Sequence, residues 1–299
     1  MRLTFAAVAA LAILTPAVAL AQDFPPARGQ APRPDFSEDS VLQAVIDSPL
    51  RSEAARARDA YRHPFETLTF WGLRPGLTVV EIEPGAGAWW TDILAPYAAQ
   101  TGGRYVAAWV DTANPQTSEG ARNARAALEA RFAGDRAVFG QASVVDFGPQ
   151  SGVGLPDQSA DMVLVARAFH NWAQSEGRTA RYMSEFFRVL KPGGVLVVEQ
   201  HRAEAGSVVG ETASTGYVPE SYVIEAAQAA GFVLEARSDI NANPLDDHDH
   251  PFGVWTLPPV RRASQDGRTL TEAERAQYDA IGESDRMTLR FVRPFTPQS

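Results

Sequence analysis

A glycine-punctuated loop after a short apolar run is the part of this sequence best suited to bind a ligand. The run Thr78–Ile82 contains Glu81, and the next residues carry Gly85 and Gly87 before an apolar stretch that begins at Ala88. This order predicts a buried parallel strand that turns directly into a helix. Glycines at such a turn let a ligand approach the backbone, and the first N–H groups of the helix present a partial positive charge to it.

The spacing of this loop separates two classes of ligand. A dinucleotide fingerprint requires a third glycine three residues after Gly87, and Trp90 occupies that position. The acid Glu81 followed by Gly85 and Gly87 instead resembles the first motif of class I S-adenosylmethionine-dependent methyltransferases. Taken alone, the motif also fits a strand–helix turn that binds nothing.

Later segments follow in the order found in that family. A second apolar strand ends at Asp111, Asp161–Ala166 is another apolar run, and a helix with apolar residues at helical spacing stops at Leu190–Gly194 before the strand Val195–Glu199. From about Arg62 to its end, the chain resembles a class I methyltransferase. The resemblance implies an α/β, Rossmann-like fold: a mostly parallel seven-stranded sheet, an antiparallel hairpin at its edge, and helices on both faces.

The remaining elements complete this scheme. The segment Ser40–Tyr61 is predicted as a helical lead-in, and another helix is predicted near Pro219–Ala230. Phe232–Ser238 and Met287–Val292 are the two strands of the edge hairpin. The long insertion between them contains a helix that the capping box Thr271–Glu274 opens.

A closer resemblance is to a group of exported bacterial proteins called predicted methyltransferases, and it covers nearly the whole mature chain. The segments that carry this resemblance are Arg62–Leu68, Gly72–Gly76, His170–Trp172, Glu199–Arg202 and Asp247–Pro251. The resemblance does not identify a substrate.

By resemblance, six residues belong to the expected S-adenosylmethionine site: Glu81, Glu83, Gly85, Gly87, Asp111 and Gln141. Gly85 and Gly87 would line its methionine part, and Glu81 would steer its amino group. Asp111 would accept hydrogen bonds from the ribose hydroxyls, as a carboxylate can, and its alternative role is a helix N-cap. Most relatives carry an acid near the adenine amino group at the third strand. Here the amide oxygen of Gln141 would accept that hydrogen bond.

Glu83 departs from the family pattern, because methyltransferases usually have glycine at this position. Its side chain would crowd the space of the cofactor's carboxylate and repel that group by on the order of 1 kcal/mol at a partly solvated site. The alternative is that Glu83 points outward and leaves the loop free.

Polar side chains after the fourth and fifth predicted strands are the candidates for catalysis. His170 could serve as a general base near neutral pH, or it is a hydrogen-bonded structural histidine. Trp172 could stack on a planar substrate or support a sulfonium. Arg167 would neutralise an anionic substrate or pair with a neighbouring acid, and His201 and Arg202 are expected to open toward the same cleft.

The segment Asp246–His250 combines the carboxylates and imidazoles that zinc or manganese prefers. Five consecutive residues cannot all converge on one ion, and the two histidines would need ligands from elsewhere. We therefore assign no metal and expect a polar loop, with a metal site as the alternative.

The first residues predict the compartment. Arg2 precedes an apolar segment that reaches about Leu14, and Ala19–Ala21 forms a small-x-small cleavage site. Residues 1–21 therefore read as a signal peptide cleaved before Gln22, since the apolar part is too short for a comfortable membrane span. We expect export, to the periplasm in a Gram-negative source, with no stable membrane anchor. The absence of cysteine excludes disulfides and thiolate chemistry.

Composition favours one domain and a small-molecule ligand. Residues 22–60 read as a proline-rich leader with the lead-in helix, and residues 61–299 as a single methyltransferase-like domain. A net charge of −9 without a Lys/Arg run argues against nucleic acid or anionic lipid as a partner.

The function expected from these features is S-adenosylmethionine-dependent methyl transfer to a small molecule. The first alternative is an exported, non-catalytic binding or interaction module on this fold, because S-adenosylmethionine is made in the cytosol. The second is a metal-assisted hydrolase that uses the loop at Asp246–His250.

Overall fold

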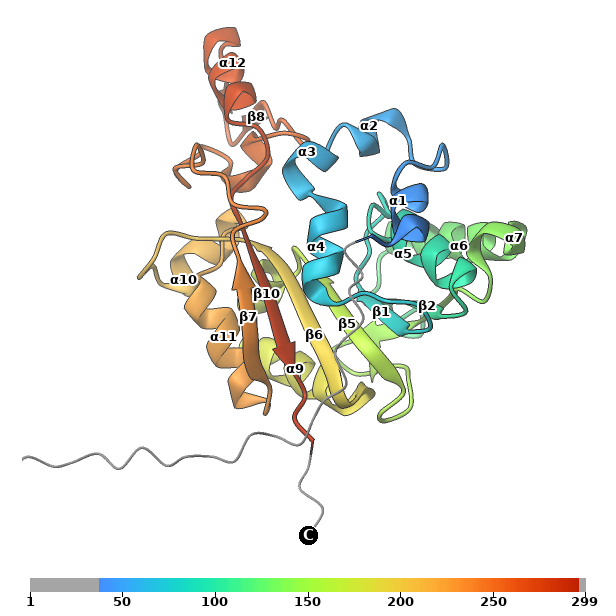
Figure 1. Cartoon of the computed structure of the whole chain (residues 1–299). Coiled ribbons are helices and arrows are strands. Elements are labelled where there is room, and N and C mark those ends of the chain that lie inside the picture. The colour runs from blue at the N-terminus through green and yellow to red at the C-terminus, as the bar shows by residue number, and fades with distance from the viewer. Residues whose placement is uncertain (1–37, 296–299) are drawn as a thin grey trace, which may run out of the picture. The chain divides into compact units, whose positions relative to one another are not determined.

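An eight-stranded sheet organises residues 38–295, the part of the chain that the computed structural model describes (Figure 1). Its strand order is β4-β3-β2-β1-β5-β6-β10-β7. β1 pairs in parallel with β2 and β5, and β10 runs antiparallel to both β6 and β7, which confirms the mostly parallel sheet with an antiparallel edge. The strands are β1 (Thr78–Ile82), β2 (Arg104–Val110), β3 (Ser143–Gly148), β4 (Gly152–Val153), β5 (Ala160–Ala166), β6 (Leu190–His201), β7 (Val233–Ser238) and β10 (Arg286–Val292).

Two details of the sheet differ from the prediction. The sheet has eight strands rather than seven, because the two-residue β4 adds an antiparallel strand beside β3. The segment Leu190–Gly194 is not a separate turn: Leu190 already pairs with Ala160, so β6 begins there. The predicted turn is instead an irregularity within the strand. The pairing register shifts between Ala160 and Met162, and Gly193 has a positive φ of 79°.

Helices cover both faces of the sheet, as predicted (Figure 1). One face packs against α1 (Ser40–Ile46), α4 (Pro64–Trp71), α5 (Thr91–Gln100), α6 (Glu119–Gly134) and α7 (Arg136–Phe139), and the other against α8 (Phe169–Ala173), α9 (Arg178–Val189) and α11 (Glu220–Ala229). In β1, Val79 belongs to the first core, and Val80 and Ile82 belong to the second. Successive strand residues point to opposite faces, so a strand covered on both sides reads as a continuous apolar run.

The predicted signal peptide, residues 1–21, and the leader up to residue 37 lie outside the described residues. The expected helical lead-in over Ser40–Tyr61 is divided into α1, α2 (Glu53–Arg56) and α3 (Asp59–Arg62). The break after α1 falls at a turn around Pro49, which has no N–H to continue a helix. Leu42 and Val45 of α1 are buried in the core, so this segment is part of the folded unit.

The insertion between β7 and β10 lies beside α3, above the end of the sheet where β5 and β6 finish (Figure 1). It contains α12 (Glu272–Ile281), the 3-10 turn η2 (Gly253–Thr256) and the small hairpin β8 (Ser264–Gln265) and β9 (Arg268–Thr269); α10 (Val209–Thr212) and the 3-10 turn η1 (Ala213–Thr215) follow β6. The predicted capping box between Thr271 and Glu274 is present. Among residues 38–295, no helix combines the length and hydropathy that a membrane span needs.

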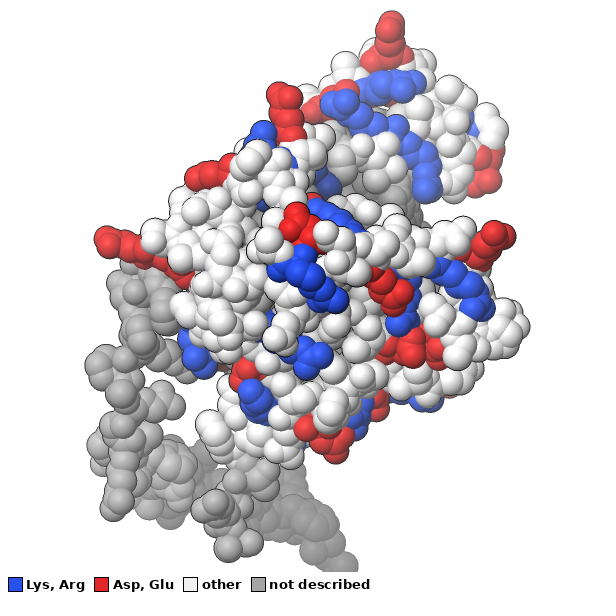
Figure 2. Space-filling view, turned by 90° about the vertical axis from the view of Figure 1, so that its right-hand side faces the viewer, with Lys and Arg blue, Asp and Glu red and all other residues white. Residues whose placement is uncertain are grey.

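Charged side chains are mixed on the surface. On the face that Figure 2 shows, basic and acidic residues are interspersed and neither sign gathers into one extended patch. A mixed surface gives little attraction to a polyanion. This face of the protein therefore gives no sign of a nucleic-acid interface.

Candidate functional site

The glycine loop after β1 presents its backbone to open space. Gly85 has a φ of 71°, and a Cβ added to Gly85 or Gly87 would meet no atom within 4 Å. The residue before α5, Trp90, makes no side-chain capping bond, so the first N–H groups of this ten-residue helix have no cap from it. An open loop beside a helix N-terminus is the arrangement that receives a polar ligand at the carboxyl end of a parallel sheet.

Glu81 is buried beneath this loop and is held there by hydrogen bonds. It is 2% exposed, and its Oε2 accepts hydrogen bonds from Thr91 Oγ1 at 2.9 Å and from Tyr105 OH at 2.6 Å. Burial raises the pKa of the Glu81 carboxyl to about 7, although both hydrogen bonds oppose this effect. One oxygen of Glu81 therefore ties β1 to α5 and β2, and its predicted contact with a cofactor amino group stays a prediction.

Glu83 does not point outward, the second orientation that the sequence allowed. Its Oε2 accepts a hydrogen bond from Trp172 Nε1 at 3.1 Å, so the side chain reaches α8. The φ of Glu83 is 50°, a left-handed conformation that favours glycine. Burial raises the pKa of its carboxyl to about 7.

The raised pKa of Glu83 predicts a stability that falls with increasing pH. In the unfolded chain this carboxyl titrates near 4.5, so between about pH 4.5 and 7 the folded state holds a proton that the unfolded state has lost. We expect Glu83→Gln to raise the free energy of unfolding by about 1–3 kcal/mol at pH 8 and to change it little at pH 4. Urea unfolding at the two pH values measures this difference.

The matched control is Glu176→Gln, because Glu176 is an exposed carboxylate near α9. It should change the free energy of unfolding equally at both pH values. An identical pH dependence in the wild type and in Glu83→Gln would contradict the prediction, because it would show that the Glu83 carboxyl has the same pKa in the folded and unfolded states.

The structure keeps Asp111 at the site and removes Gln141 from it. Asp111 follows β2 at its carboxyl end and accepts a hydrogen bond from the N–H of Ala113 at 2.8 Å. It is not a helix N-cap, because Ser118 caps α6. Gln141 is exposed and precedes β3, so it lies at the opposite end of the sheet and the prediction for it is wrong. The acid nearest the carboxyl end of β3 is Asp146, which pairs with an arginine of α6.

Trp172 is a core residue, contrary to the prediction that its ring contacts a substrate. It is 2% exposed and packs with Phe147, Phe169, Tyr182 and Phe186, at ring-centroid distances between 5.0 and 6.2 Å. The apolar spacing of α8 and α9 places this ring inside the second core. Its indole N–H, which binds Glu83, is its contribution to the site.

His170 lies beneath the site rather than on its rim. It is 7% exposed, with ring centroids 6.3 Å from His201 and 5.8 Å from Trp255. Its Nδ1 is buried and has no hydrogen-bond partner among the described residues. Burial, and then the charge of Arg167, lower the pKa of His170 to about 4. The imidazole is therefore neutral at pH 7 and can accept a proton.

The polar residues at the ends of β5 and β6, Arg167, His201 and Arg202, differ in their hydrogen-bond partners. Arg167 has a φ of 57°, and its backbone N–H donates to the carbonyl of Glu199 at 2.7 Å. Arg202, which was expected to open toward the cleft, is held by Asp285 through two hydrogen bonds of 2.8 and 3.0 Å. His201 Nδ1 lies 2.5 Å from the hydroxyl of Ser284. The charge of Arg167 acts on the carboxyl of Glu81, beneath the glycine loop.

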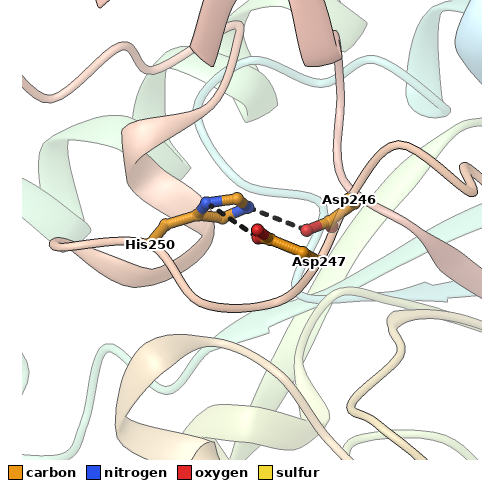
Figure 3. A group of neighbouring side chains, drawn as sticks. All are labelled: Asp246, Asp247 and His250. Carbon is orange, nitrogen blue, oxygen red and sulfur yellow. Dashed lines mark hydrogen bonds and ion pairs between the residues drawn. The ribbon is translucent and has the colours of Figure 1, made fainter. Parts of the chain in front are cut away.

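Three residues of the acidic and histidine-rich loop come together: Asp246, Asp247 and His250 (Figure 3). Their potential ligand atoms lie within 4.8 Å of one another. Asp246, however, already accepts hydrogen bonds from Tyr217 OH, from His250 Nε2 and from two backbone N–H groups. These donors occupy the lone pairs of both of its oxygens, so the group is a hydrogen-bonded brace and we assign no metal to it.

One set of charged residues received no role from the sequence as a set. Arg58, Arg62 and Glu283 meet Arg167 and Glu199 in space, although they come from distant segments. Glu283 and Arg286 precede the last apolar run within a short stretch dense in charges, and that density was the available signal. Only the fold shows that this stretch returns to α3.

Comparison with known proteins identifies the fold. Residues 91–198 match a family model described as a methyltransferase domain. Similar solved structures include the [4+2]-cyclase SpnF, at 16% identity and a TM-score of 0.54 over 87% of this chain and 95% of that one. Two others are an S-adenosylmethionine-dependent methyltransferase from Aquifex aeolicus (21%, 0.45, 67% and 93%) and an arsenic(III) methyltransferase from Chlamydomonas reinhardtii (18%, 0.44, 86% and 74%). No curated protein matches the chain in sequence.

These likenesses carry different weight. The structural likeness at a TM-score of 0.54 shows the fold, and one fold supports several reactions. The match to the methyltransferase domain indicates the cofactor, because a methyltransferase domain of this fold implies S-adenosylmethionine. The open faces of Gly85 and Gly87 and the carboxylate of Asp111 fit that molecule.

Proposed function

We propose that this protein, which has the class I methyltransferase fold and a methyltransferase domain at residues 91–198, transfers a methyl group from S-adenosylmethionine to a small molecule. The observation that carries the proposal is the open glycine loop after β1, where Gly85 and Gly87 leave the space that the cofactor needs. The fold supplies a second support, because ligands of such sheets bind beyond the carboxyl ends of the parallel strands.

The residues of the chain divide the work of binding. The loop backbone at Gly85 and Gly87 would hold the methionine part, and Asp111 would accept hydrogen bonds from the ribose hydroxyls. The cofactor supplies an electrophilic methyl group when it is bound. Methyl transfer is a displacement that depends mainly on aligning the two reactants, so the rigid junction of β1 and α5 is the main contribution of the fold.

His170 is the candidate base for an acceptor that must lose a proton. Its Nδ1 has no hydrogen-bond partner among the described residues, and the charge of Arg167, at the end of β5, acts on the ring. Because its pKa is lowered to about 4, His170 is unprotonated throughout the neutral range, and the same shift makes it a weaker base than a histidine of ordinary pKa. The role that we infer for Arg167 depends on the arginine and glutamate side chains that surround it.

Calorimetry tests the proposed function directly. Residues 22–299 are titrated with S-adenosylmethionine and with S-adenosylhomocysteine, and we expect one site with a dissociation constant between about 1 µM and 1 mM, the usual range for enzyme substrates. 5′-Methylthioadenosine, which lacks the amino-acid part, measures the contribution of the nucleoside. The absence of any heat at millimolar cofactor would instead favour a non-catalytic binding module on this fold.

Export of the protein is a second proposal and rests on residues 1–21 alone. Arg2, the apolar segment and the Ala19–Ala21 motif have the order of a cleaved signal peptide. N-terminal sequencing of the exported fraction should begin at Gln22. Recovery of the intact Met1 terminus in the membrane fraction would contradict it.

A further inference from the structure

Four arginine side chains meet two glutamates at the carboxyl ends of β5 and β6. This set, called the arginine cluster below, consists of Arg58, Arg62, Arg167, Arg286, Glu199 and Glu283. It combines α3, the ends of β5 and β6, and the start of β10. Four positive and two negative charges leave an excess of two positive charges, and burial keeps the neighbouring His170 and His201 in their neutral forms by lowering their pKa values.

Hydrogen bonds already occupy both carboxylates of the cluster. Glu283 forms ion pairs with Arg58, with Arg62 Nε at 3.0 Å and with Arg286. Glu199 Oε2 accepts a hydrogen bond from Trp90 Nε1 at 3.0 Å, and its Oε1 lies 3.2 Å from Arg286 Nε. Beyond this ion pair, Glu199 Oε1 has no hydrogen bond among the described residues, so it is the one oxygen of the two acids that remains available.

Several guanidinium nitrogens in the cluster have no hydrogen-bond partner among the described residues. These are Arg62 Nη1 and Nη2, Arg286 Nη1, and Arg167 Nε. Arg62 is 0% exposed and Arg286 is 2% exposed, so bulk water does not reach them. A buried guanidinium nitrogen without an acceptor is costly, and the four nitrogens outnumber the single free glutamate oxygen, Glu199 Oε1.

The electrostatics agree with this geometry. Burial lowers the pKa of Arg62 well below its ordinary value, and the charges of Arg286 and Arg167 lower it further. Trp89 offers part of the compensation, because the Arg62 guanidinium lies 4.7 Å from its ring centroid. A ring face accepts no in-plane hydrogen bond, so the nitrogens of Arg62 remain available to an oxyanion.

The cluster also borders the glycine loop. Trp90, the residue before α5, donates to Glu199, and the charge of Arg167 acts on the Glu81 carboxyl beneath the loop. The side chain of Arg58 is 20% exposed, and Arg167 is partly exposed. Arg58 and Arg167 are therefore the members of the cluster nearest to solvent, whereas Arg62 and Arg286 are buried.

We infer that the arginine cluster binds a carboxylate or phosphate group of the methyl acceptor, so that the substrates of this protein are small organic acids or phosphorylated molecules. The inference rests on the proposed function for the identity of the ligand as an acceptor. Guanidinium groups pair with carboxylate and phosphate through parallel N–H···O bonds. An acid group held there would place the rest of the acceptor beside His170 and the glycine loop.

The first experiment titrates the protein, residues 22–299, with inorganic phosphate and with benzoate at constant ionic strength, using chloride as the reference anion. Tryptophan fluorescence reports binding, because Trp89 and Trp90 contact Arg62 and Glu199. We expect a saturable signal whose dissociation constant rises about tenfold or more in Arg62→Gln and Arg167→Gln. The partly exposed Arg167 keeps the test valid if the buried Arg62 variant does not fold.

The matched control is Arg74→Gln, which removes the same charge from an exposed loop between α4 and β1. It should bind phosphate and benzoate as the wild type does. A signal that does not saturate, or one of equal strength in Arg74→Gln and Arg167→Gln, would overturn the inference, since ordered water would then satisfy the free donors.

A second arm separates the acceptor from the cofactor. Arg167→Gln should bind S-adenosylhomocysteine and 5′-methylthioadenosine as the wild type does. If it loses affinity for S-adenosylhomocysteine alone, the cluster holds the cofactor's own carboxylate and the inference is wrong. Phosphate binding without any S-adenosylhomocysteine binding would contradict the proposed function only, and the reverse result would contradict the inference only.

Discussion

Gly85→Val is expected to lower the affinity for S-adenosylmethionine by about hundredfold or more, to below detection by calorimetry. Gly85 has a φ of 71°, a conformation that strains a β-branched residue, and its added side chain would project into the open space of the loop. Two factors of ten correspond to about 2.8 kcal/mol, which strain and occupied volume together readily exceed.

The control for this variant is Gly102→Val. Gly102 has a φ of 72° and equally open surroundings, but it precedes β2 and lies at the opposite end of the sheet from the proposed site. Gly102→Val carries the same backbone strain, so both variants should lose similar thermal stability while Gly102→Val retains cofactor affinity. Equal loss of affinity in both would mean that strain, not the ligand space, explains the effect.

Asp111→Ala supplies a graded comparison within the same titration. It removes a carboxylate that would accept charge-assisted hydrogen bonds from the ribose, and we expect a loss of roughly 1.5–3 kcal/mol in all. The expected loss is therefore about tenfold to hundredfold, smaller than that of Gly85→Val. Unchanged affinity in Asp111→Ala would move the ribose contact to another residue, with Asp146 of β3 as the next candidate.

The sequence was sufficient for elements whose pattern is local. The apolar runs at Thr78–Ile82 and Asp161–Ala166 correspond to β1 and β5. They could be recognised because a strand that is buried on both faces is a continuous apolar run without alternating polar residues. The capping box at Thr271 likewise depends on a few neighbouring residues. Gln141 was assigned to the third strand, but that strand begins only at Ser143. Its apolar pattern is weak, because Ser143–Gly148 is only partly buried and contains Asp146.

Properties that depend on several segments could not be read from the sequence. Trp172 looked available to a substrate, but rings from β3 and α9 enclose it. The charge balance around Arg167 depends on Arg62 and Glu283, more than 200 positions apart in the chain. A sequence pattern indicates which residues lie on one face of a helix or strand. A functional site depends in addition on which helices and strands lie next to one another in the fold.

His170→Ala is expected to lower turnover by about 10²–10⁴, the usual contribution of a general base, while cofactor affinity changes less than about twofold. His170 Nδ1 has no hydrogen-bond partner among the described residues, and the cofactor contacts that we propose involve the glycine loop and Asp111 rather than His170. The assay needs an acceptor, and the arginine cluster directs the search to phenols and amines that carry a carboxylate or phosphate group, offered with labelled cofactor.

The pH profile separates a base from a structural histidine in this experiment. Because the pKa of His170 is lowered to about 4, its proton-accepting form persists as the pH falls, so wild-type turnover should show no loss from this group between pH 8 and 5. Asn171→Ala, an exposed neighbour on the same helix, should retain wild-type turnover and serves as the control. In His170→Ala, turnover should instead rise with pH, as the acceptor ionises without help. Wild-type turnover in His170→Ala would make this residue structural and leave alignment of the two reactants as the whole of the catalysis.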